Sequence, residues 1–251
     1  MHNNKVDIIL PVYNSKSFIL ETLRSIVIQT YKNWSAIIVD DGSTDSSVDL
    51  INKFIKSSKY KKKFILIKNK INKGQAFSRN LALKYCNSKF IAFIDSDDIW
   101  QKNKLKKQIN FMLKNNYDFT YSDYKSIKNN TIRTIKTPSF FNYKNFTKNT
   151  SIATSTMIIK KKILKNIIFP DLKLCEDYYF KCQILKSNDA YKCPGVYLFY
   201  RLRNNSLQSE RLRVLLTLWK INKNLNKMNF INNLVSIFFV IINSFKKYAF
   251  R

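Results

Sequence analysis

The segment FIAFIDSDDIWQKNKLKKQINFML, residues 90–113, joins an apolar run to an amphipathic run through three acidic side chains. The apolar run predicts a buried strand, and the spacing of apolar residues after it predicts a helix that starts near Gln101. Asp95, Asp97 and Asp98 stand close together in a chain that has 45 Lys and Arg but only 16 Asp and Glu. Such scarce acids at the end of a strand point to a positively charged partner there.

The same order of strand, polar turn and helix occurs three times before residue 90. The strands are VDIILPVY (6–13), a run that ends at Val39, and FILIK (64–68). The first of them is followed by a helical pattern over residues 15–29, for which Ser15 is the predicted N-cap. Strands that alternate with helices of this length need crossover connections. The sequence therefore predicts an α/β fold with a mainly parallel sheet.

Polar residues follow each of the four predicted strands at the point where it ends. They are Tyr13 and Asn14, Asp40 and Asp41, Asn72 and Gly74, and Asp95 and Asp97. In an open parallel sheet, ligands bind beyond the carboxyl ends of the strands, where these residues would meet. The chain has only 3 glycines, and two of them, Gly42 and Gly74, fall in these turns, where the backbone must bend sharply or approach a ligand.

Carboxylates at this edge of the sheet suit two kinds of contact. They accept hydrogen bonds from ribose hydroxyls or base N–H groups, and they bind phosphate only through a hard divalent cation such as Mg²⁺ or Mn²⁺. Ser96, Asp97 or Asp98 can instead cap the following helix, and this is the role that we expect for Asp98. An acidic pair at a strand end, such as Asp40 and Asp41, also fits a phospho-acceptor receiver domain. The further acids after the fourth strand and the length of 251 residues count against that alternative.

The net charge of +29 allows two explanations. One is a bias towards A/T-rich codons, since Lys, Asn and Ile dominate the chain; the other is attraction to polyanions. A basic nucleic-acid-binding module is therefore an alternative, but it leaves the acidic strand ends unexplained. The cysteines form no CxxC pair and the only histidine is His2, which disfavours a zinc or disulfide scaffold. We expect neither a signal peptide nor a clear transmembrane helix.

Three segments in the first half carry a resemblance to a known family. DIILPVYNSKSFILETLRSIVIQTYKNWSAIIVDDGSTDSS (7–47), NKGQAFSRNLAL (72–83) and FIAFIDSDDIW (90–100) resemble the family 2 glycosyltransferases, which have the A-type, Rossmann-like nucleotide-sugar fold. The resemblance continues more weakly through ATSTMIIKK (153–161), LCEDYYFKCQIL (174–185) and YRLRNNSLQS (200–209). It is strongest to bacterial enzymes that assemble O-antigen, capsule or teichuronic-type polysaccharides.

The resemblance implies a role for each matching position. Pro11, Val12 and Tyr13 would line the uracil and ribose pocket, and the donor nucleotide-sugar would also meet Asp40, Asp41, Asn72, Gly74, Arg79, Asp95 and Ser96. Asp97, the second acid of the DxD element, would hold Mn²⁺ or Mg²⁺. In the acceptor half, Glu176 would lie on the acceptor side and Asp177 would be the catalytic general base.

The resemblance also implies the reaction. It is a metal-dependent, inverting transfer of a hexosyl group from a nucleotide donor, with a UDP-sugar expected, to a polyprenyl-diphosphate-linked saccharide in cell-surface polysaccharide synthesis. The QxxRW element of processive synthases is missing and YRLRNNS stands near its place, so a non-processive enzyme is expected. No nucleic-acid partner is expected for such an enzyme.

The chain divides at the sequence level into a catalytic domain and a tail. Residues 1–205 would form the catalytic domain, with a nucleotide-sugar-binding half (1–114) and an acceptor half (115–205), and residues 206–251 a basic amphipathic helical tail. In the tail, RLRVLLTLWKINKNL places Leu212, Leu215, Leu216 and Trp219 on one side of a helix. The tail would lie in the membrane interface or pack across the back of the domain. The expected location is cytoplasmic, peripherally associated with the inner face of the cytoplasmic membrane.

Overall fold

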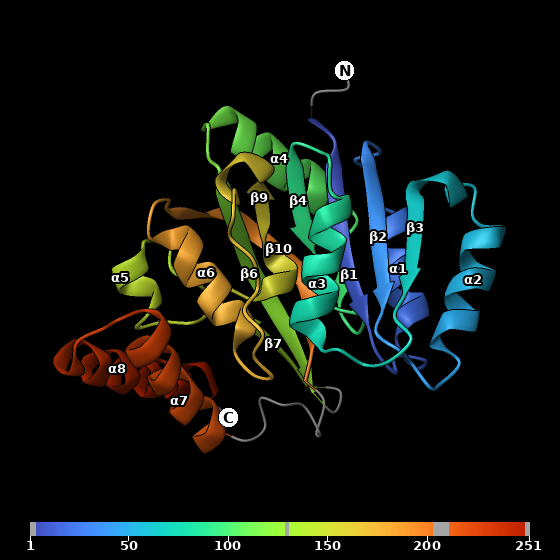
Figure 1. Ribbon diagram of the computed structural model, residues 1–251. Coiled ribbons are helices and arrows are strands. Elements are labelled where there is room, and N and C mark those ends of the chain that lie inside the picture. The colour runs from blue at the N-terminus through green and yellow to red at the C-terminus, as the bar shows by residue number, and fades with distance from the viewer. Residues whose placement is uncertain (1–3, 129–130, 203–210, 249–251) are drawn as a thin grey trace.

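The computed structural model describes residues 4–128, 131–202 and 211–248 (Figure 1). The strands are β1 (Val6–Val12), β2 (Trp34–Asp40), β3 (Phe64–Lys68), β4 (Phe90–Phe93), β5 (Ile99–Trp100), β6 (Phe119–Lys128), β7 (Thr131–Ile135), β8 (Phe140–Phe141), β9 (Ile158–Lys160) and β10 (Ala190–Arg201). The α-helices are α1 (Ile19–Val27), α2 (Ser47–Ser57), α3 (Gln75–Tyr85), α4 (Lys104–Lys114), α5 (Tyr143–Phe146), α6 (Glu176–Leu185), α7 (Arg211–Lys220) and α8 (Phe230–Tyr248).

All these strands belong to one sheet. Its order is β3-β2-β1-β4-β9-β6-β10-β5, with β7 beside β6 and β8 beside β10. The pairs β3–β2, β2–β1 and β1–β4 are parallel, which confirms the predicted parallel arrangement for the first half. In the second half β9 runs antiparallel to both β4 and β6, whereas β10 runs parallel to β6. The register pairs Val12 with Asp40 and Asp40 with Lys68, so the strands of the first half end in line.

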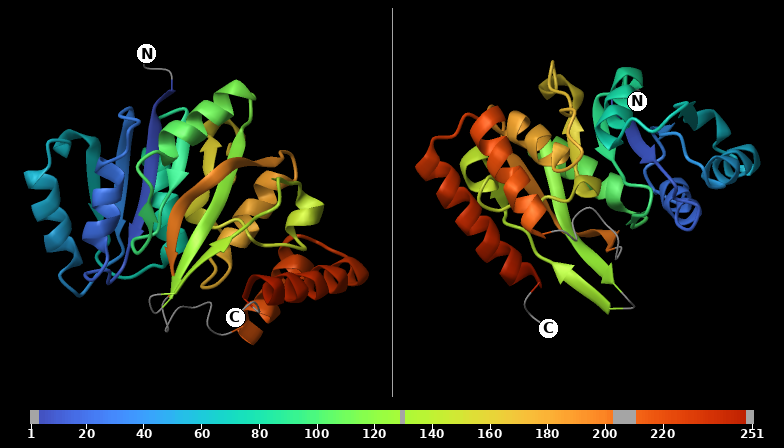
Figure 2. Two further views of the ribbon diagram at one scale, coloured as in Figure 1. Left: turned by 180° about the vertical axis from the view of Figure 1, so that it is seen from behind. Right: turned by 60° about the horizontal axis from the view of Figure 1, so that its bottom comes forward.

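Alternate strand residues point to opposite sides of the sheet, and apolar side chains on both sides pack against helices. Ile9 and Phe93 lie in the core on the side of α3 and α6, whereas Ile8 and Ile38 lie in the core on the side of α1 and α4. α3 and α6 lie in front of the sheet in Figure 1, and α1 and α4 lie in front of it in the reverse view of Figure 2. Helices on both faces leave the strand ends as the accessible edge of the sheet.

Two predicted helix starts are wrong. The first helix spans Ile19–Val27 rather than residues 15–29, and its N-cap is Phe18. The Ser15 hydroxyl instead donates to the carbonyl of Tyr13, 3.0 Å away. The fourth helix begins at Lys104 with Asn103 as N-cap, not near Gln101. β5 pairs antiparallel with β10, and the Gln101 N–H still donates to the Tyr197 carbonyl at 3.0 Å, so the chain stays extended through Gln101 and turns before the helix.

The described part of the tail packs on the catalytic domain. α7 continues into a π-helical turn over Ile221–Leu225, and α8 follows. Leu218, Ile221 and Val240 join the core that also contains Tyr178 of α6. The predicted domain boundary at residue 205 lies outside the described residues. None of the helices in the described ranges combines the length and the apolar content that crossing a bilayer requires.

The apolar residues predicted on one side of α7 differ in their exposure. Leu215 packs against the core, but Leu212 and Leu216 are exposed, and Leu218 is the buried leucine of this helix. Side-chain hydrogen bonds from the neighbouring α8 to the domain fix the orientation of the tail.

Candidate active site

The carboxyl ends of β1, β2, β3 and β4 form one rim, and hydrogen bonds extend the sheet slightly past each strand. The Asp41 N–H donates to the Val12 carbonyl at 2.8 Å, and the Asn69 N–H donates to the Asp40 carbonyl at 2.8 Å. The Ile94 N–H donates to the Ile9 carbonyl at 3.0 Å. These bonds fix the backbone of the acidic turns, so the side chains that leave the rim start from fixed positions.

Asp41 organises the turn that contains Asn72 and Gly74. Its carboxylate accepts hydrogen bonds from Asn69 Nδ2 (2.8 Å), the Lys73 N–H (3.0 Å) and the Gly74 N–H (2.7 Å). Asn72 Oδ1 accepts a second bond from the Gly74 N–H at 3.1 Å. The predicted contact of Asp41 and Asn72 with the nucleotide remains a prediction, and in the protein both side chains hold the turn before α3.

Both glycines at the rim are required by the backbone. Gly74 has φ of 92° as the N-cap of α3, and Gly42 has φ of 70°, a region in which L side chains are strained. A Cβ at Gly42 would lie 2.7 Å from the carbonyl carbon of Ile71, so this turn also has no room for a side chain.

Asp40 presents an acceptor with an unmet hydrogen bond. The side chain is buried, and Oδ2 accepts from the Ser43 N–H at 3.2 Å. Oδ1 is buried and has no partner among the described residues. A buried carboxylate oxygen without a donor is costly, so this atom fits a ligand that brings an N–H or O–H group. Pro11 and Val12 are buried beside it, and Tyr13 exposes its ring at the rim.

The loop after β4 is held from three sides. The Asp95 N–H donates to Ser155 Oγ at 3.0 Å, and the Ser96 hydroxyl lies 2.6 Å from that of Ser15. Arg201 Nη1 donates to the Asp97 carbonyl at 3.1 Å. The backbone is therefore fixed, while the side chains of Asp95 and Asp97 are partly exposed.

The prediction that Asp98 begins a helix is wrong. It is fully buried ahead of β5, and Oδ1 accepts from the Arg201 N–H at 3.3 Å. Burial, with the charges of Asp95 and Asp97, raises the pKa of Asp98 well above its usual value. Asp98 therefore supports the loop from inside and does not present a carboxylate at the rim.

Arg79 joins the two halves of the rim. Nη2 lies 2.7 Å from Asp95 Oδ1, and Nη1 lies 2.7 Å from Glu176 Oε1. The guanidinium is buried over the ring of Phe169, with 5.2 Å between the guanidinium carbon and the ring centroid. Burial lowers its pKa, but Asp95 and Glu176 outweigh this effect and raise the pKa above the ordinary arginine value. The predicted nucleotide contact of Arg79 remains a prediction, since both of its terminal nitrogens bind carboxylates.

Glu176 and Asp177 begin α6, and their carboxylates differ. Burial raises the pKa of Glu176, an effect that Arg79 partly offsets. Asp177 Oδ2 accepts from Lys181 Nζ (2.6 Å) and Thr154 Oγ1 (2.8 Å), and its side chain is 31% exposed. Burial also raises the pKa of Asp177, but Lys181 outweighs it and brings the pKa to about 2. Asp177 is thus ionised at neutral pH and reachable from outside.

The acids at the rim fit a divalent cation only in part. Their oxygens are the hard ligands that Mg²⁺ and Mn²⁺ prefer. One oxygen of Asp95, however, already binds Arg79 and Gln75 Nε2, the latter at 3.2 Å. Within the described ranges, no group of three or more His, Cys, Asp or Glu residues could hold a metal ion. The predicted role of Asp97 as a ligand of Mn²⁺ or Mg²⁺ remains a prediction.

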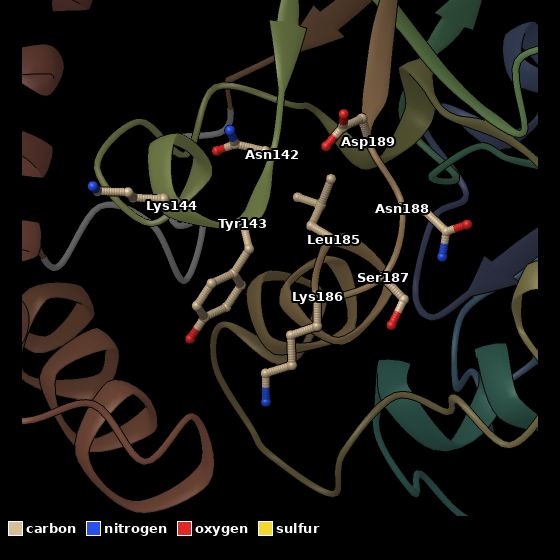
Figure 3. Close-up of a pocket in the computed structure, with 8 residues that line it drawn as sticks. All are labelled: Asn142, Tyr143, Lys144, Leu185, Lys186, Ser187, Asn188 and Asp189. Carbon is tan, nitrogen blue, oxygen red and sulfur yellow. The ribbon is translucent and has the colours of Figure 1, made fainter.

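Two cavities lie away from the rim. One, of about 450 Å³, is lined by α5 and the C-terminal end of α6, where Figure 3 shows Tyr143, Leu185, Lys186 and Asp189. The other, of about 1030 Å³, lies near the start of β4 and includes Lys89. None of the predicted site residues lines either cavity.

Sequence analysis missed the residues that hold the acids in place. Lys181 had a detectable signal, because it follows Asp177 by four positions on a helix. Thr154 and Ser155 lie in the segment 153–161, but nothing local connects them with the acids. Arg201 belongs to YRLRNNS (200–206), which carried no residue-level prediction, and residues 203–206 of that segment lie outside the described residues.

Comparison with known proteins identifies the family. The sequence profile of Glycosyl transferase family 2 matches residues 7–169. WfgD of Escherichia coli, a UDP-Glc:alpha-D-GlcNAc-diphosphoundecaprenol beta-1,3-glucosyltransferase, is 35% identical over 257 residues, which cover 100% of this chain and 97% of WfgD. This match favours the glycosyltransferase hypothesis over the receiver-like and nucleic-acid-binding alternatives.

Solved structures share the fold. TarS of S. aureus (residues 1–349, with UDP-GlcNAc) matches with a TM-score of 0.74 at 22% identity, covering 96% of this chain and 73% of TarS. The mannosyltransferase PcManGT of Pyrobaculum calidifontis, with GDP-Man and Mn²⁺, matches with a TM-score of 0.72 at 16% identity, covering 93% of this chain and 69% of its own. This chain is an enzyme with the A-type glycosyltransferase fold and belongs to the family 2 glycosyltransferases.

Proposed function

We propose that this enzyme transfers glucose from UDP-glucose to an α-D-GlcNAc-diphosphoundecaprenol acceptor, forming a β-1,3 linkage at the inner face of the cytoplasmic membrane. The near full-length similarity to WfgD supports this donor and acceptor. The observation that carries the proposal is the position of Arg79, which binds Asp95 of the DxD element with one nitrogen and Glu176 with another. This bridge brings the donor loop and the acidic start of α6 into one site.

The donor base would bind beside Asp40. Uracil has one ring N–H, and the buried Asp40 Oδ1 is an acceptor without a partner among the described residues. The exposed ring of Tyr13 can stack on the base, and Pro11 and Val12, which are buried beside Asp40, would line the pocket. Asp41, Asn72 and Gly74 would act by holding the turn that the nucleotide meets.

Asp97 would hold Mn²⁺ or Mg²⁺ together with the donor diphosphate. When bound, the cation neutralises the charge that develops on the departing UDP. Since the described residues contain no group of three or more His, Cys, Asp or Glu that could hold a metal ion, oxygens of the donor diphosphate would supply further ligands. The protein alone would then bind the metal weakly.

Asp177 would act as the general base. Its Oδ2 is occupied by Lys181 and Thr154, which leaves Oδ1 to accept the proton of the acceptor hydroxyl. With a pKa of about 2 it is ionised but weakly basic, so the proton would move as the hydroxyl attacks and becomes acidic. Attack opposite the leaving UDP inverts the α-linked donor and gives a β-linked product.

The test is transfer to a synthetic GlcNAc-diphospho-lipid. The enzyme should form a disaccharide from UDP-glucose in preference to UDP-galactose and UDP-GlcNAc, and a β-glucosidase should release the added sugar. A product formed only from another donor, or an α-linked product, would contradict the proposal.

A further inference from the structure

Helix α8 buries two polar side chains against the domain, beside Val240, and leaves several large apolar side chains exposed. Asn233 and Ser236 are each only 1% exposed against the domain. Ile231, Leu234, Phe238 and Phe245 are 70%, 53%, 58% and 60% exposed. Spacings of three, four and seven residues place these four on one side of a helix. We call them the outer stripe.

Hydrogen bonds to the domain and to the turn after α7 fix this orientation. Ser236 Oγ donates to the Thr147 carbonyl at 2.7 Å, and Asn243 Nδ2 donates to the Lys148 carbonyl at 2.9 Å. Asn233 Oδ1 accepts from Asn222 Nδ2 at 3.1 Å. Turning the outer stripe inward would break all three bonds and leave buried polar groups unpaired. The exposure of the stripe is therefore built into the fold.

The inner hydrogen bonds also connect α8 to the helix that carries the candidate base. Asn222 Oδ1 accepts from the Tyr178 hydroxyl at 2.6 Å, and Tyr178 directly follows Asp177 in α6. The tail is thus held at a fixed position relative to the active site.

The surroundings of the outer stripe are basic. Residues 211–248 contain no Asp or Glu, and three lysines are exposed, Lys220 at the end of α7 and Lys223 and Lys227 between α7 and α8. Figure 1 shows α7 and α8 at the end of the molecule towards which β1 and β2 run, the end that carries the rim. An exposed apolar stripe with adjacent cations suits an anionic lipid surface. Two copies of the same basic surface would repel each other, which disfavours a dimer through this face.

We propose that the outer stripe inserts into the headgroup region of an anionic bilayer and, with the neighbouring lysines, docks the enzyme with its rim towards the membrane. The proposal deepens the proposed function, on which it rests for the lipid-linked acceptor. Docking would hold the rim at the level where the diphosphate of such an acceptor leaves the bilayer.

The test is co-sedimentation of the full chain with vesicles of phosphatidylethanolamine and phosphatidylglycerol. The variant Ile231→Ser/Leu234→Ser/Phe238→Ser should partition ~10-fold or more weakly than wild type. The matched control Ile28→Ser/Ile132→Ser/Ile168→Ser changes exposed apolar side chains elsewhere and should bind as wild type does. Binding should fall with added salt and on neutral phosphatidylcholine vesicles.

Three results would overturn the docking proposal. They are no vesicle binding by wild type, equal binding by the outer-stripe variant, or a wild-type dimer in light scattering that the variant converts to a monomer. The proposed function is tested separately: Asp97→Ala should bind vesicles normally without transferring sugar. The outer-stripe variant should keep wild-type kcat/KM on a short-chain, water-soluble acceptor, and a loss there would also count against a role limited to docking.

Discussion

Arg79 Nη1 and Glu176 Oε1 lie 2.7 Å apart although 97 positions separate them in the sequence. The second terminal nitrogen of Arg79 lies 2.7 Å from Asp95. One buried guanidinium therefore fixes the distance between the DxD loop and the start of α6. The relative position of these two acidic segments therefore depends on this arginine.

Replacing Arg79 should harm both stability and activity. Arg79→Ala leaves Asp95 and Glu176 without their shared cation, and breaking a buried pair costs about 3–5 kcal/mol. Thermal unfolding and transfer rates would be compared with those of Arg24→Ala, which changes an exposed arginine. An Arg79→Ala protein as stable as this control would show that the bridge is not needed.

Metal binding should require the nucleotide. UDP with Mn²⁺ at about 100 times its Kd should add about 2.7 kcal/mol of stability, which is about 5–10 °C in Tm for a chain of this size. Mn²⁺ alone should give a much smaller shift, and Asp97→Ala should lose most of the joint shift. Asp49→Ala, at an exposed acid on α2, is the control. A full shift with Mn²⁺ alone would contradict the shared coordination.

Asp40 should discriminate between bases. Asp40→Asn can place an N–H group opposite the uracil N–H, so the affinity for UDP should fall ~10–100-fold, which corresponds to about 1–3 kcal/mol. CDP, whose base lacks that N–H, should be affected less. Calorimetric Kd values for both nucleotides test this, and an equal loss for the two would argue against a direct contact between Asp40 and the base.

Lys181 should set the acid limit of activity. The ammonium group lowers the pKa of Asp177 to about 2, so protonation of Asp177 does not limit wild-type activity near neutral pH. Lys181→Met removes the cation while burial remains, so the pKa of Asp177 should rise and the acid limb of kcat against pH should move upward. Lys186→Met, on an exposed lysine of the turn after α6, should leave the profile unchanged. An unmoved acid limb in Lys181→Met would mean that Asp177 is not the group that titrates.

The first half of the fold was predictable because its signals are local. Apolar runs, acidic turns and two glycines mark where β1 to β4 end, and parallel pairing brings Asp40 and Asp95 to one edge. The mistakes came from partners distant in sequence. Asp98 was expected to cap a helix, but pairing between β5 and β10, about 100 residues later, delays that helix.

The tail shows a second limit of sequence analysis. An amphipathic pattern predicts an apolar face against the domain, yet α8 also turns polar side chains to the domain beside Val240, because Ser236 and Asn243 donate to the carbonyls of Thr147 and Lys148. Those acceptors lie about 90 positions earlier in the sequence, and no local sequence pattern indicates that they would contact α8.

The most direct test of the account is the rate of sugar transfer by Asp177→Asn, measured together with UDP affinity. The amide keeps the shape of Asp177 but cannot take the acceptor's proton. We expect kcat to fall about 10²–10⁴-fold while the Kd for UDP changes little, and Asp171→Asn, at an exposed acid in the loop before α6, should behave as wild type. A wild-type kcat in Asp177→Asn would contradict the assignment of the catalytic base and, with it, the active site that Arg79 holds together.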